Sequence, residues 1–211
     1  MLLATSGNTM TTAAQSTCAT VLFVDLRGYT RLAERLPACR VVPLLDEFLT
    51  MLTLTTERYG GQIYHVAGDG LMAGFGVHDP SQDGTLEAIA AGRAMLVRFE
   101  PIAVRWHRDF NIVTGIGIGI HQGEVARAYL GPPGNKTLTL IGDTVNVAAR
   151  LCSRARAGEV LFSGSVAQSE QIIARPIPEP KPFLRLPQFA LKGRTAPLDI
   201  YCVPAPDRVA V

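Results

Sequence analysis

Two short apolar segments joined by a glycine-rich turn constrain the fold more than any other feature of the sequence. Gln62 to Val66 and Leu71 to Phe75 flank Ala67-Gly-Asp-Gly70. This pattern predicts two antiparallel strands joined by a tight turn. Asp69 is then expected at the tip of the hairpin.

Apolar stretches at helical spacing precede and follow this hairpin. Arg40 to Tyr59 and residues 83 to 108 each predict a long amphipathic helix, and we expect Pro101 to kink or end the second one. Before the first helix, Thr20-Val-Leu-Phe-Val-Asp25 predicts a buried strand that delivers Asp25 to the edge of the sheet.

The rest of the chain alternates between strand and helix signals. We expect two strands paired antiparallel across a turn at Gly123, namely Ile112 to His121 and Glu124 to Leu130. The further expected elements are a loop at Gly131 to Gly134, a strand at Thr137 to Ile141, a helix at Thr144 to Arg156, a strand at Glu159 to Phe162, a helix from Ser165 to about Ile173 and, after a proline-rich loop, two final strands.

The order strand, helix, hairpin, helix, strand predicts the fold class. It is the order of an α+β, ferredoxin-like (split βαβ, palm-type) core, βαββαβ, here followed by a C-terminal αβ extension. Hydrophobic residues make up 47% of the 211 residues, which suits one buried domain. We place this domain at residues 19–203, with a tail at 204–211. Residues 1–18 are expected to be a flexible tail or the end of a linker from an upstream regulatory domain.

Charge, cysteines and hydropathy argue against several classes of function. With 20 Lys and Arg against 18 Asp and Glu, the net charge of +2 gives no electrostatic footprint for nucleic acid or an anionic membrane. The 4 cysteines are scattered without a CxxC pair, so they indicate neither a zinc site nor a disulfide framework. No apolar run approaches the roughly 20 residues that a membrane-spanning helix needs. We therefore expect a cytoplasmic protein.

Two aspartates form the first candidate functional group. Asp25 and Asp69 end neighbouring predicted strands and would converge at one edge of the sheet. Magnesium prefers one or two protein carboxylates together with substrate phosphates, so the pair predicts a metal site. Arg27-Gly-Tyr-Thr30 follows directly, where the free N–H groups at a helix start could hold a triphosphate. Taken alone, Asp69 would be a turn residue.

The second candidate group lies in Ile141-Gly-Asp-Thr-Val-Asn-Val-Ala-Ala-Arg150. Asn146 and Arg150 are four residues apart on the predicted helix, so their side chains share a face. They present an amide and a fixed cation to a cleft or a partner, although Arg150 alone could be a plain surface cation. The residues expected to point toward the core are Val145, Ala148, Ala149 and Cys152.

Several segments, in this order, resemble class III adenylate and guanylate cyclases. They are Val21-Leu-Phe-Val-Asp-Leu-Arg-Gly-Tyr-Thr30, Val66-Ala-Gly-Asp-Gly-Leu-Met72, Gly115-Ile-Gly-Ile-Gly-Ile-His-Gln-Gly123, Ile141 to Arg150 and, near the end, Ala190-Leu-Lys-Gly193. The resemblance extends from about Ala19 to Val203. It implies a nucleotide cyclase that acts as a homodimer with two interfacial sites, because the family's metal carboxylates and transition-state pair come from opposite chains.

The resemblance also implies a role for each matching residue. By position, Asp25, Leu26 and Asp69 match the site for two Mg²⁺ or Mn²⁺ ions. Asn146 matches the residue that orients the ribose, and Arg150 matches the one that stabilises charge on the transferring phosphorus. Lys192 would bind the terminal phosphates, and further substrate contacts would come from Arg27, Gly28, Tyr29 and Thr30. The implied reaction is attack of the ribose 3′-oxygen on the α-phosphorus of ATP, which yields cyclic AMP and pyrophosphate.

The purine positions depart from the usual pattern. His65 stands where adenylate cyclases of this type usually have lysine, and Thr139 stands where they have Asp or Thr. Thr139 matches the Thr-variant, class IIIb-like subgroup, some members of which respond to bicarbonate, and its hydroxyl could accept a hydrogen bond from the adenine amino group. His65 either donates to adenine N1 or is a half-buried strand histidine without a substrate role. Neither position has the Glu and Cys associated with guanylate cyclases, which favours ATP over GTP.

Two other classes of function fit parts of the sequence. A catalytically silent cyclase-like module would dimerise or bind nucleotide to regulate a neighbouring domain, and His65 is its best support. Such a module has no chemical need for both aspartates together with Asn146 and Arg150. A diguanylate cyclase would share the split βαβ core, but its Gly-Gly-Asp-Glu-Phe signature is missing from the sequence.

Overall fold

A computed structural model describes residues 15–79, 81–169, 172, 183–189 and 197–203 of the chain. Its elements in chain order are β1 (Gln15–Arg27), α1 (Tyr29–Arg35), α2 (Ala38–Arg58), β2 (Gln62–Ala67), β3 (Gly70–Phe75), α3 (Thr85–Phe110), β4 (Gly115–Leu130), β5 (Thr137–Ile141), α4 (Asp143–Arg154), β6 (Glu159–Ser163), α5 (Gly164–Ala167), β7 (Leu184–Phe189) and β8 (Leu198–Val203). None of the helices in these ranges combines the length and the apolarity that crossing a membrane requires.

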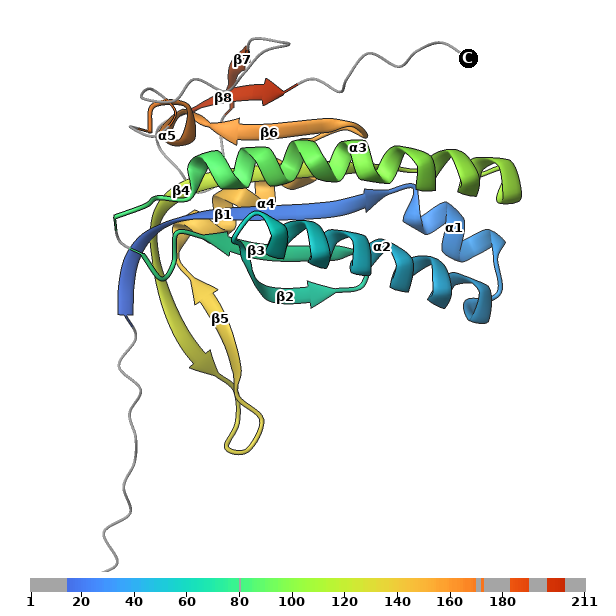
Figure 1. The fold of residues 1–211 in the computed structure, drawn as a ribbon, viewed down its shortest axis with the longest axis horizontal. Helices are drawn as coiled ribbons and strands as arrows, with labels where there is room; N and C mark the ends of the chain where they lie inside the picture. The colour runs from blue at the N-terminus through green and yellow to red at the C-terminus, as the bar shows by residue number, and fades with distance from the viewer. Residues whose placement is uncertain (1–14, 80, 170–171, 173–182, 190–196, 204–211) are drawn as a thin grey trace, which may run out of the picture.

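The described strands belong to one sheet, with α2 and α3 side by side on one face (Figure 1). The strand order is β2-β3-β1-β4-β6-β8-β7, and β5 pairs with the second half of β4. Within β2-β3-β1-β4 all neighbours are antiparallel, which is the arrangement of the βαββαβ core. The predicted fold class is therefore confirmed, and β6 extends the core parallel to β4.

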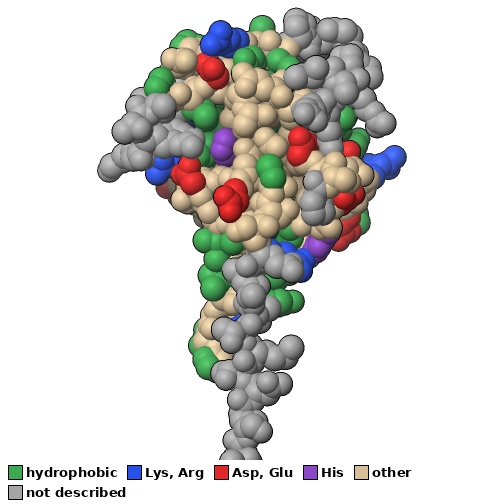
Figure 2. Space-filling model, turned by 90° about the vertical axis from the view of Figure 1, so that its left-hand side faces the viewer, with side chains coloured by type: hydrophobic (Ala, Val, Ile, Leu, Met, Phe, Trp, Pro, Cys, Tyr) green, Lys and Arg blue, Asp and Glu red, His purple; other side chains and the backbone are tan. Residues whose placement is uncertain are grey.

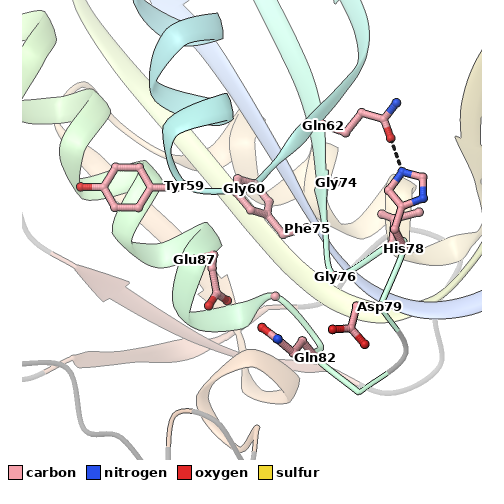
Figure 3. A pocket seen from close by; sticks show the side chains of 12 residues that line it. Tyr59, Gly60, Gln62, Gly74, Phe75, Gly76, His78, Asp79, Gln82 and Glu87 are labelled. Atoms are coloured by element: carbon pink, nitrogen blue, oxygen red, sulfur yellow. Dashed lines mark hydrogen bonds between the residues drawn. The ribbon is translucent and has the colours of Figure 1, made fainter.

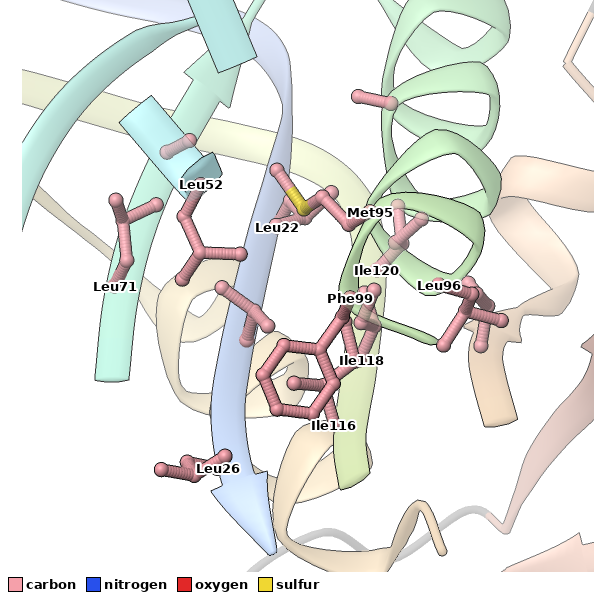
Figure 4. Packing of buried hydrophobic residues seen from close by; sticks show 14 of the residues in the cluster. Leu22, Leu26, Leu52, Leu71, Met95, Leu96, Phe99, Ile116, Ile118 and Ile120 are labelled. Carbon is pink, nitrogen blue, oxygen red and sulfur yellow. The ribbon is translucent and has the colours of Figure 1, made fainter. Parts of the chain in front are cut away.

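The main hydrophobic core fills the space between the sheet and these two helices. Every second residue of β1, namely Leu22, Val24 and Leu26, points into it. Figure 4 shows Phe99 and Met95 of α3 packed over the strands beneath them. Phe99 also contacts Phe48 and Trp106 edge to face, with ring centroids 5.4 and 5.7 Å apart, a favourable geometry for aromatic rings.

The opposite face of the sheet has α4 in very close contact with β4. The alternation Gly115-Ile-Gly-Ile-Gly-Ile120 puts the isoleucines in the main core and the glycines on the α4 side. A Cβ atom at Gly119 would lie 2.0 Å from the backbone nitrogen of Cys152 and 2.4 Å from the carbonyl oxygen of Ala148. Only glycine therefore lets the helix backbone lie directly on the strand.

β4 is a single strand, so the predicted turn at Gly123 and the antiparallel pairing across it are wrong. Gly123 pairs with Ala19 of β1 in the middle of a continuous ladder, and the last part of β4 pairs with β5. A Cβ atom at Gly123 would lie 2.7 Å from Oγ1 of Thr144. The glycine thus makes room for the start of α4 instead of reversing the chain.

The other differences concern where elements begin and end. β1 begins at Gln15, so residues 15–18, which were expected to belong to the N-terminal tail, pair with β4 instead. α3 does not end at Pro101 but continues to Phe110, because its buried side chains on both sides of the exposed proline, including Phe99 and Ile102, keep packing on the core. The helix expected from Ser165 is α5, and part of the expected stretch lies outside the described residues. The two expected final strands are β7 and β8.

The contact between α4 and β4 gives a test of the fold. We expect Gly119→Ala to lower the free energy of unfolding by about 3 kcal/mol, because the added methyl group has no room against the helix backbone. Gly92→Ala in α3 is the matched control: its Cβ would meet no atom closer than 3.4 Å, and alanine favours the helix, so stability should not fall. Urea unfolding followed by circular dichroism measures both, and equal stabilities would contradict the described packing.

Candidate active site

Asp25 and Asp69 lie at the same edge of the sheet. The register between β1 and β3 places Asp25 opposite Gly70, the residue that follows Asp69. The N–H of Leu26 also donates to the carbonyl oxygen of Asp69 at 3.0 Å. An ideal Cβ at Gly70 would lie 3.5 Å from Oδ1 of Asp25, so this glycine leaves one face of the carboxylate open.

The electrostatics of this edge favour a cation. Burial raises the pKa of Asp25, the negative charge of Asp69 raises it further, and the guanidinium of Arg27 lowers it by a smaller amount. A divalent ion between the two carboxylates would relieve their repulsion, so this donor set fits Mg²⁺ or Mn²⁺. In the described part of the chain, no group of three or more His, Cys, Asp or Glu side chains could hold a metal ion.

The residues around Asp25 differ in what they can contribute. The side chain of Leu26 is buried in the main core, so only its backbone could take part in the predicted metal site. Gly28 has φ +89°, and a Cβ there would lie 2.6 Å from the carbonyl oxygen of Val113, so the turn between β1 and α1 requires glycine. Tyr29 and Thr30 form the first turn of α1, and their predicted contact with a triphosphate stays a prediction.

Arg27, which the sequence assigned to the substrate, is engaged by protein groups in the structure. Its Nη1 forms an ion pair with Oδ2 of Asp25, and its Nη2 donates a hydrogen bond to the carbonyl oxygen of Cys152. Its Nε donates to the carbonyl oxygen of Ala155 at 3.1 Å. The arginine therefore joins the end of β1 to the end of α4.

Asn146 and Arg150 share the exposed face of α4, as their spacing predicts. The residues on the other side of this helix are buried, among them Val147, Ala148 and Leu151. Because the buried side rests on the sheet, the amide and the guanidinium point away from it. The face with Asn146 and Arg150 is thus directed to the outside of the chain.

The purine candidates lie on two strands that contact each other, β2 and β5. His65 is exposed rather than half-buried, and Thr139 on β5 is half-buried. Their contact with adenine stays a prediction. Lys192, the candidate partner for the terminal phosphates, lies outside the described residues.

A pocket at the other end of β3 contains none of the predicted site residues (Figure 3). The ends of α2 and β3 and the start of α3 line it, including Tyr59, Phe75 and Glu87. A hydrogen bond of 2.6 Å between His78 and Gln62 runs along one side. Since Asp69 precedes β3, the whole strand, roughly 17–20 Å at 3.3 Å per residue, separates this pocket from the aspartates.

A cluster of polar side chains that the sequence analysis did not identify links α5 to the sheet through hydrogen bonds. Nδ1 of His121 lies 2.6 Å from Oγ of Ser163, and Oγ of Ser165 donates to the carbonyl oxygen of Gln122 at 2.9 Å. His121 pairs with Val21, whereas Asp25 pairs with Gly117, so the group lies four residues along β4 from the aspartates. Its contacts indicate a structural role.

The raised pKa of Asp25 predicts how stability depends on pH. The folded protein holds the Asp25 proton more tightly than the unfolded chain, so Asp25 lowers stability as pH rises from the ordinary carboxyl range through its folded-state pKa. At pH 7 without metal, we expect Asp25→Asn to raise the melting temperature, and at pH 3 the difference should vanish. Asp109→Asn is the control, because hydrogen bonding to Arg108 lowers the pKa of Asp109 and removing that charge should not stabilise the protein. A less stable Asp25→Asn protein at pH 7 would contradict this account.

Solved structures with the same fold include two nucleotide cyclases. The adenylyl cyclase CyaB from P. aeruginosa is 29% identical with a TM-score of 0.83, over 92% of this chain and 97% of that one. The guanylyl cyclase Cya2 is 24% identical with a TM-score of 0.79, over 93% of this chain and 96% of that one, and shows the shared fold.

The curated relatives are longer proteins. An adenylate cyclase of Anabaena cylindrica is 31% identical over 140 residues, 66% of this chain and 28% of that protein. An uncharacterized protein of Mycobacterium tuberculosis is 35% identical over 138 residues, 65% of this chain and 24% of that protein. The chain thus spans about a quarter of the length of these relatives. The sequence profile of the adenylate and guanylate cyclase catalytic domain matches residues 11–195, and the chain therefore belongs to this family of nucleotide cyclase domains.

Proposed function

We propose that this domain converts ATP to 3′,5′-cyclic AMP and pyrophosphate at two sites, each shared between two copies of the chain. The proposal rests mainly on the outward direction of Asn146 and Arg150. Asp25 and Asp69 lie at the sheet edge, whereas Asn146 and Arg150 point away from the sheet on the outer face of α4. An amide and a guanidinium that point to the outside of one chain can meet a triphosphate held at the aspartates of another chain.

A projecting hairpin supports contact with a second copy. The far part of the β4–β5 hairpin extends from the body of the molecule (Figure 1), and hydrophobic side chains are visible along this projection in Figure 2. Tyr129 and Leu130 at the far end of β4 are each 51% exposed. Large apolar side chains on such an extension are typical of a protein interface. A homodimer would cover them.

The described residues suit in-line phosphoryl transfer. Two Mg²⁺ or Mn²⁺ ions at Asp25 and Asp69 would lower the pKa of the ribose 3′-hydroxyl and neutralise phosphate charge. From the other chain, Asn146 would orient the ribose, and Arg150 would stabilise the charge that develops on the α-phosphate oxygens. The 3′-oxygen loses its proton and bonds to the α-phosphorus as the bond to pyrophosphate breaks.

Two side chains favour ATP over GTP. The hydroxyl of Thr139 can accept a hydrogen bond from the adenine amino group, and a neutral His65 can donate one to adenine N1. His65 is exposed and therefore able to reach a ligand. An upstream regulatory domain, a bicarbonate response and a cytoplasmic location stay predictions from the sequence. A silent nucleotide-binding module, which His65 would favour, differs by binding ATP without turnover.

Complementation between two inactive variants tests the shared site. We expect Asp25→Ala, Asp69→Ala and Arg150→Ala homodimers each to lose metal-dependent cyclisation by at least about a hundredfold. A mixture of Asp25→Ala and Arg150→Ala chains should regain activity, because the heterodimer contains one intact site. Product formation from ATP and from GTP, each with Mg²⁺ and Mn²⁺, is the measurement.

The outcomes of this assay separate the candidate functions. No recovery in an isolated heterodimer would refute the shared site, and a wild-type chain that binds ATP but forms no product would identify a silent module. A clear preference for GTP would refute the proposed role of Thr139. The dimer content of every variant, measured by size exclusion with light scattering, controls for lost assembly.

Substitution of the purine candidate gives a separate test. If His65 contacts adenine, we expect His65→Lys to raise kcat/KM for ATP several-fold, because a lysine has longer reach and a fixed charge. His107→Lys in the last turn of α3 is the control for adding a lysine elsewhere, and it should leave kcat/KM unchanged. An unchanged value for His65→Lys would show that His65 has no substrate role.

A further inference from the structure

Arg27 connects two parts of the chain that belong to different halves of the candidate site. It leaves the last position of β1, two residues after Asp25, and its guanidinium reaches the final turn of α4. Cys152, one of the two carbonyl acceptors, lies two residues after Arg150. A single side chain thus contacts both a candidate metal ligand and the helical turn that follows Arg150.

The end of α4 presents two carbonyl groups to Arg27. The last carbonyl groups of a helix have no helical N–H partner, and the C-terminal end of the helix dipole is negative. The carbonyl of Cys152 lies within this final turn, where it also accepts the N–H of Ala155 at 3.0 Å, and the carbonyl of Ala155 belongs to the C-cap residue. A guanidinium presents five N–H donors in a rigid plane, so it can donate to both carbonyls and to a carboxylate in fixed directions, whereas an ammonium group has three donors on a single atom at the end of a flexible stem.

The glycine opposite Arg27 leaves space for this contact. A Cβ at Gly117 would lie 2.6 and 2.7 Å from Nη2 and Nε of Arg27 and 2.8 Å from the carbonyl oxygen of Ala155. Sγ of Cys152 lies 3.3 Å from the carbonyl oxygen of Gly117 and donates to it. The guanidinium is therefore enclosed between β4 and α4, and the Arg27 side chain is 25% exposed.

We propose that Arg27 is a positioning residue that holds the Asp25 carboxylate and the last turn of α4 in one fixed arrangement. This inference rests on the proposed function in one respect: in the shared site, the Asp25 and the Arg150 of one chain serve different active sites. Each Arg27 then acts on both sites of the dimer, on one through Asp25 and on the other through α4. A residue that only bound the triphosphate would act on one site.

Stability measurements test the positioning role without any assay of activity. We expect Arg27→Ala and Arg27→Lys each to lower the melting temperature of the dimer by about 3–6 °C, because the carbonyls and Asp25 lose their partner. Gly117→Ala should also lower the melting temperature, because its methyl group collides with the guanidinium. In the Arg27→Ala/Gly117→Ala protein this collision is absent, so the fall in melting temperature should be smaller than the sum of the two single falls. Arg108→Ala, which removes a 72% exposed ion-pair partner of Asp109, is the control and should change the melting temperature by less than about 1 °C.

Heterodimers separate positioning from substrate binding. In a dimer of one Asp25→Ala chain and one Arg150→Ala chain, the intact site takes α4 from the first chain and the aspartates from the second. We expect Arg27→Ala in either chain to lower kcat by roughly tenfold with KM for ATP changed less than about threefold, because misplaced groups weaken the transition state. Differently tagged chains allow each heterodimer to be isolated.

Two results would overturn the proposal. One is an unchanged melting temperature for both Arg27 variants, together with an effect of Gly117→Ala that is the same with Arg27 or with Ala at position 27. The other is a loss of activity only when Arg27→Ala is in the chain that supplies the aspartates, seen as a higher KM for ATP that Arg27→Lys restores. That result would make Arg27 a substrate ligand. If the wild-type protein forms no cyclic nucleotide, the proposed function fails, but the melting temperatures still decide whether Arg27 holds Asp25 and α4 together.

Discussion

The close contact between α4 and β4 is the constraint on which the rest of the candidate site depends. Gly119 lets the backbone of α4 lie directly on β4, and Gly117 leaves room for the Arg27 guanidinium beside it, while the isoleucines between these glycines fill the core on the other side. A helix held this closely cannot roll, because Cys152 and Ala148 already touch the strand. This fixes the outward direction of Asn146 and Arg150 and brings the last turn of α4 within reach of Arg27.

At the ends of β1 and β3, the residues that suit a metal site lower the stability of the fold. A partly buried carboxylate beside a second carboxylate is unfavourable in the folded protein, as the raised pKa of Asp25 indicates. Arg27 offsets part of this cost on the Oδ2 side, whereas Oδ1 faces Gly70. The residue types that weaken the fold here are the ones that a divalent ion requires.

Local patterns in the sequence predicted most helices and strands, but they could not predict contacts between segments that are distant in the chain. The hairpin around Asp69, the helix predicted at Arg40 to Tyr59 and the α4 spacing of Asn146 and Arg150 follow from short-range periodicity. Gly123 was misinterpreted because a glycine that admits a packed helix looks the same in sequence as a glycine in a turn. The contacts of Arg27 could not be predicted, since its carbonyl acceptors lie 125 and 128 residues away. The alternating glycines were the available signal of a helix lying against β4.

Two-fold symmetry in the proposed dimer would give the outward direction of Asn146 and Arg150 a function. In a symmetric dimer, the outer face of α4 on each chain contacts the same surface of the other chain. If an aspartate edge is what it meets, two equivalent sites form together and neither forms alone. A monomeric enzyme with the same residues would have to turn Asn146 and Arg150 toward its own sheet, where Val147, Ala148 and Leu151 are already buried. The outward orientation is therefore a consequence of the packing that stabilises the domain, and the proposed dimer is the arrangement in which this orientation would serve catalysis.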